Sequence, residues 1–129
     1  MKFLVLIYPD PKKLAAMPES EFVATMRGCL AHADELRARG KLLDTQMLQP
    51  PPTAKTLRTK TGKLTITDGP FTETKEMLAG FNVVEAASLD EAVQIAAEFP
   101  WTEVGSVEVR PILPVEEMRA RVAAGGAER

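Results

Sequence analysis

The amino-acid sequence predicts an α+β domain of the ferredoxin-like, split β-α-β type, with a β-hairpin inserted between its two halves. Strand-helix-strand patterns occupy residues 3–48 and 80–112, and a hairpin signal lies between them. The first strand, at 3–8, is apolar on both alternations, which is typical of a central strand covered on both faces. In this fold, helices cover one face of an antiparallel sheet.

The first half begins with the apolar run Phe3–Tyr8, and the sequence Pro9-Asp10-Pro11 ends that strand. From Pro18 to Arg39, apolar residues recur every three or four positions, which predicts an amphipathic helix. Pro18 suits the first helical turn, and Gly40 suits the C-terminal end. The second strand is predicted at Lys41–Leu48.

Prolines and glycines divide the middle of the chain. Gln49-Pro50-Pro51-Pro52 is stiff and extended and cannot lie in a sheet interior. The β-prone runs Lys55–Thr59 and Lys63–Thr67, joined by Lys60-Thr61-Gly62, predict a hairpin. Asp68-Gly69-Pro70 then predicts a rigid corner, because proline fixes φ and glycine adopts backbone conformations that other residues avoid.

The second half repeats the strand-helix-strand pattern. A strand is predicted at Gly80–Ala86, and Ser88 and Glu91 form a capping box, in which each side chain accepts a hydrogen bond from the other residue's backbone N–H. The helix that starts there is ended by Pro100. A terminal helix is predicted at Pro114–Ala124, and the residues after it are expected to fray.

The last strand of the sheet, predicted at 105–112, alternates strictly. Val107 and Val109 share the face that meets the helices, and Glu108 and Arg110 project from the other face. A sheet whose central strand is apolar on both sides does not leave its second face in water, so a second copy of the chain is the expected cover. The sequence therefore predicts a homodimer with a partly polar cavity between or beside its sheets.

Length and composition exclude several classes of protein. The 129 residues are 45% hydrophobic and 26% charged, which fits one globular domain, placed at 1–113, followed by a C-terminal helix and tail at 114–129. A net charge of −2 argues against direct nucleic-acid binding, and no apolar run reaches the ~20 residues of a membrane span. The N-terminal segment lacks a signal-peptide pattern, so the cytoplasm is the expected compartment.

Metal and cofactor motifs are missing from the sequence. Cys29 is the single cysteine and His32 the single histidine, so neither an internal disulfide nor a metal site is predicted. There is no phosphate-binding glycine loop or nucleophile elbow, and no cofactor is predicted. Cys29 is interpreted as a small buried side chain, and His32 as a surface or rim residue rather than a catalytic one.

Several segments also carry a family resemblance that spans about residues 1–113. The chain closely resembles the YCII-related proteins, in particular the branch named for its Asp-Gly-Pro-Phe motif, through Leu48-Gln49-Pro50-Pro51, Thr67-Asp68-Gly69-Pro70-Phe71, Glu73-Thr74-Lys75-Glu76, Gly80-Phe81 and Gly105-Ser106-Val107-Glu108-Val109-Arg110-Pro111. The resemblance implies a dimeric α/β-barrel built from ferredoxin-like halves. It also implies that some members are enzymes with a His and an Asp as acid and base. The matching positions here are Gly28 or Cys29 and Phe99, so no catalytic residue is assigned.

Residues around the Asp-Gly-Pro corner are candidate ligand-binding groups. They are Asp68, Phe71, Glu73 and Lys75. A carboxylate reaches the acid–base range only when burial or like charge shifts its pKa, and a lysine can hold an anionic ligand. The alternative is structural, because Asp68 can cap a turn through its own side chain and residues 73–76 can form a solvated connector.

Two further candidates lie on the uncovered face of the predicted sheet. Tyr8 can donate its hydroxyl into a cavity or simply end an amphipathic strand. Arg110 can clamp a carboxylate or phosphate through its planar guanidinium, or it can form an ion pair with Glu108 across a subunit interface. Trp101 is interpreted as a packing or dimer-contact residue.

The sequence thus predicts a homodimer that binds a small molecule, with no reaction assigned. One alternative is an acid–base enzyme, of lyase or hydrolase type, acting on a small anionic or aromatic substrate. Another is a regulatory partner without catalysis, because the resemblance implies a link to sigma-factor-dependent transcription. A purely structural dimerisation domain ranks last.

Overall fold

The computed structural model describes residues 1–72 and 74–125. A four-stranded antiparallel sheet has the order β2-β5-β1-β6, and a separate two-stranded sheet pairs β3 with β4. The strands are β1 (Lys2–Pro9), β2 (Leu42–Met47), β3 (Lys55–Lys60), β4 (Lys63–Asp68), β5 (Gly80–Glu85) and β6 (Gly105–Pro111). The helices are α1 (Pro11–Ala16), α2 (Glu19–Ala38), α3 (Leu89–Ala97) and α4 (Val115–Ala123), with 3-10 turns η1 (Pro51–Thr53) and η2 (Pro100–Glu103). None of the helices in the described ranges combines the length and hydropathy of a bilayer span.

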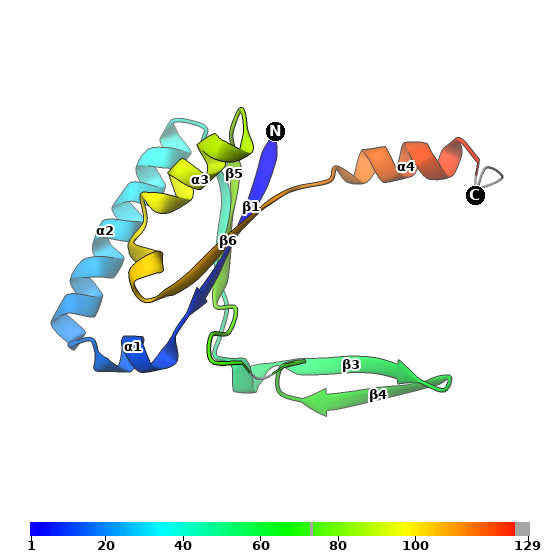
Figure 1. Ribbon diagram of the computed structural model, residues 1–129, viewed down its shortest axis with the longest axis horizontal. Coiled ribbons are helices and arrows are strands. Elements are labelled where there is room, and N and C mark those ends of the chain that lie inside the picture. Colours follow the sequence, from blue (N-terminus) through cyan, green and yellow to red (C-terminus); the bar gives the residue numbers. More distant parts are fainter. Residues whose placement is uncertain (73, 126–129) are drawn as a thin grey trace.

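This architecture confirms the predicted α+β class with antiparallel sheets. The two halves, β1-α2-β2 and β5-α3-β6, interleave, so that β1 lies inside the sheet between β5 and β6. The apolar character of both faces of β1 predicts that position. Helices α2 and α3 cover one face of the sheet (Figure 1). Each predicted strand boundary lies within one residue of the observed one.

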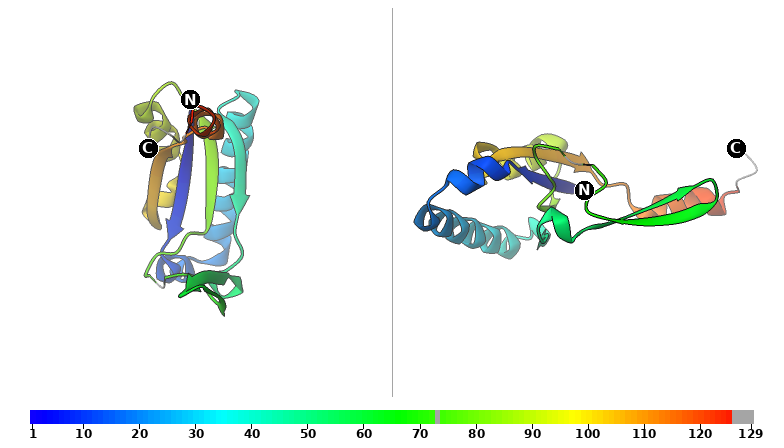
Figure 2. Two further views of the ribbon diagram at one scale, coloured as in Figure 1. Left: turned by 90° about the vertical axis from the view of Figure 1, so that its right-hand side faces the viewer. Right: turned by 90° about the horizontal axis from the view of Figure 1, so that it is seen from below.

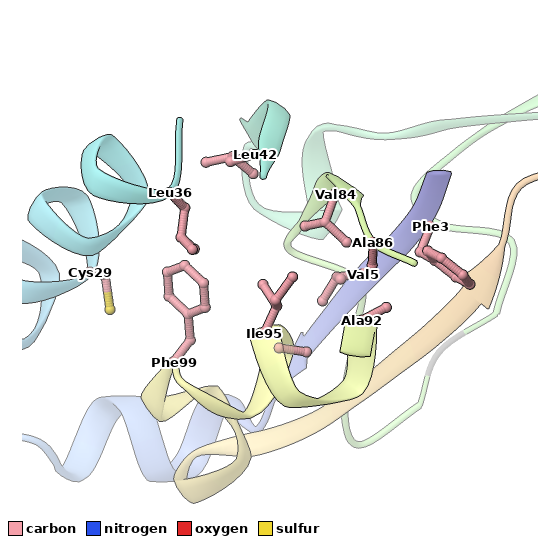
Figure 3. Close-up of a cluster of buried hydrophobic side chains, with 11 residues drawn as sticks. Phe3, Val5, Cys29, Leu36, Leu42, Val84, Ala86, Ala92, Ile95 and Phe99 are labelled. Atoms are coloured by element: carbon pink, nitrogen blue, oxygen red, sulfur yellow. The ribbon is translucent and has the colours of Figure 1, made fainter. Parts of the chain in front are cut away.

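The hydrophobic core lies between the sheet and these two helices. In the strand register, Phe3 is opposite Val84, and Val5 is opposite Val109. Side chains from the sheet and from the two helices gather in one cluster (Figure 3). Its buried hydrophobic residues are Phe3, Val5, Cys29, Leu36, Leu42, Val84, Ala86, Ala92, Ile95, Ala96 and Phe99.

At the start of α3, only one of the two hydrogen bonds of the predicted capping box forms. The Ser88 hydroxyl oxygen accepts a hydrogen bond from the Glu91 backbone N–H at 3.1 Å. The Glu91 carboxylate does not return the bond to Ser88; it accepts a hydrogen bond from the Lys41 ammonium at 2.8 Å instead. This ion pair and hydrogen bond lower the pKa of Glu91. Helix α3 is therefore tied to the start of β2 as well as capped.

The short helix α1 is a correction to the sequence analysis, which interpreted Pro9-Asp10-Pro11 only as the end of a strand. Asp10 is the N-cap of α1, and its carboxylate accepts a hydrogen bond from the Lys12 N–H at 2.9 Å. Pro11 occupies the first helical position, where its missing N–H costs nothing. The same three residues therefore end β1 and start α1.

The hairpin formed by β3 and β4 is amphipathic. Thr61 and Gly62 both have positive φ, 49° and 79°, as a tight two-residue hairpin turn requires. Leu57 is opposite Ile66 in the register, and Leu64 lies on the same face two residues along β4. These three side chains are 60–61% exposed. The hairpin therefore presents an apolar face that the described part of its own chain leaves uncovered.

The hairpin and α4 project from the sheet on the side away from α2 and α3 (Figure 1), and a second direction of view agrees (Figure 2). We call these two projections the arms. No residue of α4 is buried. The sheet face between the arms is called the open face, and its side chains come from alternate strand positions: Leu4, Leu6, Tyr8, Phe81, Val83, Glu108 and Arg110.

Candidate functional site

A cleft of about 200 Å³ lies between α2 and the covered face of the sheet. Its walls are mostly apolar, with side chains from α2, from η2 and from strands β1, β2 and β5. The lining residues are Ile7, Pro9, Leu14, Phe22, Met26, Cys29, Leu30, Ala33, Thr45, Gln46, Met47, Ala79, Gly80, Asn82, Phe99 and Trp101. An apolar hollow with few polar groups is the usual form of a small-molecule site.

Asn82 is the buried polar residue of this cleft. It lies on β5 between Val5 of β1 and Thr45 of β2, and only 5% of its surface is exposed. Within the described residues, no hydrogen bond joins its side-chain amide to another group. This amide can both donate and accept hydrogen bonds. Asn82 can therefore bind a polar group of a ligand held among apolar walls.

Sequence reasoning did not select Asn82. The signal was present, because asparagine is depleted in strands and here interrupts an apolar run at Gly80–Ala86. A strand pattern alone does not show on which side of the sheet a cleft opens.

Asp68 and Phe71, two of the candidate ligand-binding residues predicted from the sequence, lie at the base of the hairpin. The Asp68 carboxylate pairs with the Lys55 ammonium, and its side chain is 83% exposed. Phe71 is exposed, and the Arg58 guanidinium lies 4.6 Å from its ring centroid. An open hollow of about 450 Å³ adjoins Asp68. Glu73, selected with them, lies outside the described residues.

The corner itself is ordered by hydrogen bonds, as the sequence predicts for a rigid join. Gly69 has φ of 94°, and its N–H donates to the Ala54 carbonyl at 2.7 Å. The Thr56 hydroxyl donates to the Gly69 carbonyl at 2.8 Å. The corner therefore fixes where the hairpin leaves the domain.

Lys75 and Glu76 tie the following loop to the end of the main sheet. The Lys75 ammonium lies 3.5 Å from the Asp10 carboxylate, and the Ser106 hydroxyl donates to the Glu76 carboxylate at 2.6 Å. The Asp10 side chain is 4% exposed. Burial alone would raise the pKa of Asp10, but the Lys12 N–H and the Lys75 charge together hold it below the ordinary aspartate value. Lys75 thus has a structural partner that sequence reasoning missed.

Tyr8 and Arg110 lie on the open face. The Tyr8 hydroxyl donates to the Glu108 carboxylate at 3.3 Å. Burial raises the pKa of Tyr8, and the adjacent Glu108 charge raises it further, while Arg110 acts in the opposite direction. Arg110 is opposite Leu4 in the register. The structure therefore groups Tyr8, Glu108 and Arg110 together, on a different part of the molecule from the hairpin base.

The structure also shows the surroundings of Cys29, Trp101 and His32. Cys29 is buried, as interpreted from the sequence, and burial raises the pKa of its thiol, which disfavours the reactive thiolate. Trp101 packs against the core cluster. His32 is only partly exposed, and its ring lies edge-on to Phe99, with centroids 4.9 Å apart. In the described ranges, no three or more His, Cys, Asp or Glu residues gather in a way that could hold a metal ion.

Comparison with known proteins adds a family and a fold. The model of the YCII-related domain matches residues 1–116. An uncharacterised protein from Rhizobium meliloti (strain 1021) is 39% identical over 114 residues, which cover 87% of this chain and 92% of that protein. Among solved structures, 5-chloro-2-hydroxyhydroquinone dehydrochlorinase from Burkholderia phenoliruptrix AC1100, in complex with 2,5-dihydroxybenzoquinone, superposes with a TM-score of 0.51. It is 22% identical, and the match covers 88% of this chain and 94% of that one.

Proposed function

The chain belongs to the YCII-related domain family, and we propose that it is a homodimeric protein that binds a small ring compound in the cleft between α2 and the sheet. The observation that carries this proposal is Asn82, a residue only 5% exposed whose side-chain amide makes no hydrogen bond within the described residues, in the wall of an apolar cleft. This amide can donate to and accept from a polar group of a ligand, so a ligand in the cleft would complete its hydrogen bonds.

The size of the cleft limits the ligand. A dry protein cavity of about 150 Å³ holds a benzene ring. The cleft, at about 200 Å³, therefore suits a single ring with one or two small substituents. One substituent would be a hydroxyl or carbonyl oxygen, because those groups pair with an amide. The dehydrochlorinase of the same fold binds 2,5-dihydroxybenzoquinone, a molecule of this description, which makes that compound the first probe to test.

The homodimer proposal rests on the open face of the sheet. Two copies whose open faces pack together would cover Leu4, Leu6 and Phe81 and form the barrel that the family resemblance implies. The arms, which project from the sheet on the side of the open face (Figure 1), would reach past the edges of the partner's sheet. Tyr8 and Arg110 would then line the space between the two sheets.

The ligand contacts predicted from the sequence stay a proposal of their own. Tyr8 and Arg110 would meet a polar molecule between the sheets, and Lys75 lies near the end of the same strands. Asp68 and Phe71 would approach the partner at the hairpin base, and Glu73 belongs to the same segment. The cytoplasm remains the predicted compartment. The regulatory alternative would show instead as binding to a transcription factor without binding to the cleft.

The cleft proposal is tested by titrating 2,5-dihydroxybenzoquinone into the wild type and three variants in a calorimeter. Met26→Trp fills the cleft and is expected to abolish binding, while Val23→Trp places the same side chain on α2 outside the cleft and is expected to leave binding intact. Asn82→Leu removes the amide and is expected to raise Kd about tenfold, the usual effect of losing one hydrogen bond. Equal affinity in the wild type and Met26→Trp, or no binding to the wild type, would contradict this ligand site.

A further inference from the structure

A second hollow, a groove of about 250 Å³, runs between α2 and the end of α3. It shares Cys29 and Phe99 with the cleft, and its other walls are different. Gly28 is one of its lining residues, and a Cβ added there would meet nothing within 4 Å. Glycine weakens the interior of a helix relative to alanine. At Gly28, its effect is to keep the groove open.

His32 lies one turn along α2 from Gly28, in the wall of the same groove. Its side chain is 26% exposed, but its Nε2 atom is fully buried and has no hydrogen-bond partner among the described residues. The Glu98 carboxylate lies 3.4 Å from that nitrogen. Catalytic hydrogen bonds are often long and poorly aligned before substrate binds. His32 and Glu98 are therefore placed as a histidine–carboxylate pair, with an Nε2-to-carboxylate distance longer than that of a strong hydrogen bond.

We propose that His32 and Glu98 form an acid–base pair that removes a proton from the hydroxyl group of a small uncharged molecule, or of water, in this groove. Glu98 accepts a hydrogen bond from Nε2–H, which leaves the lone pair of Nδ1 free to act as the base. His32 is the catalytic residue, and Glu98 positions it. The remaining walls include Ala24, Thr25 and Pro100 and add no charge, so an uncharged substrate is favoured.

The proposed step transfers one proton and no electrons overall. The substrate O–H bond breaks and leaves its electron pair on oxygen, while Nδ1 gains the proton. The Glu98 carboxylate balances the positive charge of the imidazolium that forms. With water as the hydroxyl compound and an ester as acceptor, the hydroxide adds to the carbonyl carbon and expels the alcohol as its anion. The imidazolium then returns its proton to solvent.

The pair can be observed directly, because His32 is the only histidine of the chain. A ¹⁵N spectrum of histidine-labelled protein at a pH where the ring is neutral is expected to show the Nε2–H tautomer. Glu98→Gln is expected to mix the two tautomers, and Glu98→Asp is expected to restore the wild-type pattern in part. A wild-type spectrum dominated by Nδ1–H, or one that Glu98→Gln leaves unchanged, would overturn the assignment of Glu98.

The base is tested with 4-nitrophenyl acetate as the probe ester. His32→Gln is expected to lower the hydrolysis rate about tenfold, the low side of what a positioned general base contributes. Gly28→Leu, which fills open space, is expected to lower it equally while keeping the wild-type tautomer. Glu35→Gln removes an exposed carboxylate of the same helix and is the matched control.

The proposal that His32 is the base would be contradicted if the His32→Gln or the Gly28→Leu protein hydrolysed the ester at the wild-type rate. The His32→Gln protein keeps every lysine, so its rate also measures hydrolysis by surface amines. Each variant is compared by its melting temperature, and Gly28→Leu, in open space, is expected to fold at least as well as the wild type. Since neither substitution touches the Asn82 wall of the cleft, the calorimetric test of that cleft succeeds or fails separately.

Discussion

The two faces of the main sheet differ in what covers them. On the covered face, side chains such as Phe3 and Val84 are buried by helices of the same chain. On the open face, Leu4 and Leu6 are half-buried, and the arms around them carry apolar side chains that are about 60% exposed, such as Ile66. The chain therefore completes a hydrophobic core on one side only. The other side has exposed apolar side chains of the kind that mark an interaction surface, which the proposed second copy would cover.

The arms lead to the same conclusion through their size. A two-stranded hairpin is marginally stable in water without further packing, and helices shorter than about 12–15 residues are marginal alone. Within the described part of the chain, no element packs on the apolar face of the β3–β4 hairpin. Helix α4 has nine residues, none of them buried. A partner that packs on their apolar faces would supply the missing support.

The largest expected effect lies on the covered face. Leu36 is 1% exposed in the core, and Leu36→Ala should lower the free energy of unfolding by about 2–5 kcal/mol, because it leaves a cavity. Urea denaturation followed by circular dichroism measures this. A loss below about 1 kcal/mol would mean that the covered side is not the main source of stability.

The next effect lies in the hairpin, where neighbouring residues point to opposite faces. Ile66→Glu places a charge on the apolar face and should weaken dimerisation on the order of 100-fold, because the charge would be buried without a partner. Thr65→Glu places the same charge on the other face and is the control. Sedimentation equilibrium gives both dissociation constants. Equal constants for the two variants would remove the hairpin from the interface.

A smaller effect is expected where the loop after the hairpin meets the sheet. The pKa of Asp10 is lowered in the folded protein, so its charge stabilises the fold above the ordinary aspartate pKa of 3.8 and loses that effect as the pH falls through the folded value. Asp10→Asn keeps a capping oxygen but removes the charge. Its melting temperature should be a few degrees lower than that of the wild type at pH 7. The difference should close in acid, and a constant difference would exclude the charge as its cause.

The smallest effect is expected in α4. Arg119 and Glu116 form an exposed ion pair three residues apart, and Arg119→Ala should change the free energy of unfolding by less than about 0.5 kcal/mol. Thermal unfolding at low protein concentration checks this. A larger loss would mean that α4 packs on its own chain, contrary to its exposure.

Much of the fold was predictable because its signals are local. Alternation identified the strands, and the positive φ of Thr61 and Gly62 agrees with the hairpin signal at that turn. Helix α1 was not predicted, because Asp10 serves two purposes and the first, ending a strand, accounts for the Pro-Asp-Pro pattern without the second, capping a helix. Its Asp-Pro pair is a recognisable N-terminal helix signal.

The candidate sites were less predictable because they depend on packing between distant segments. The cleft is lined by residues of α2, β2 and β5 that are far apart in the sequence, and no local pattern encodes the space between them. The approach of His32 to Glu98 joins residues 66 positions apart in the sequence, since 98 − 32 = 66. Tyr8 and Asp68 were grouped by their chemistry, whereas the structure places them at the open face and at the hairpin base.

The molar mass in solution tests the contrast between the two faces most directly. Light scattering on the full chain at micromolar concentration should give twice the 14.1 kDa of one chain, and the Ile66→Glu variant should shift towards a single chain. A wild-type mass of 14.1 kDa under the same conditions would contradict the proposal that a second copy covers the open face and the arms.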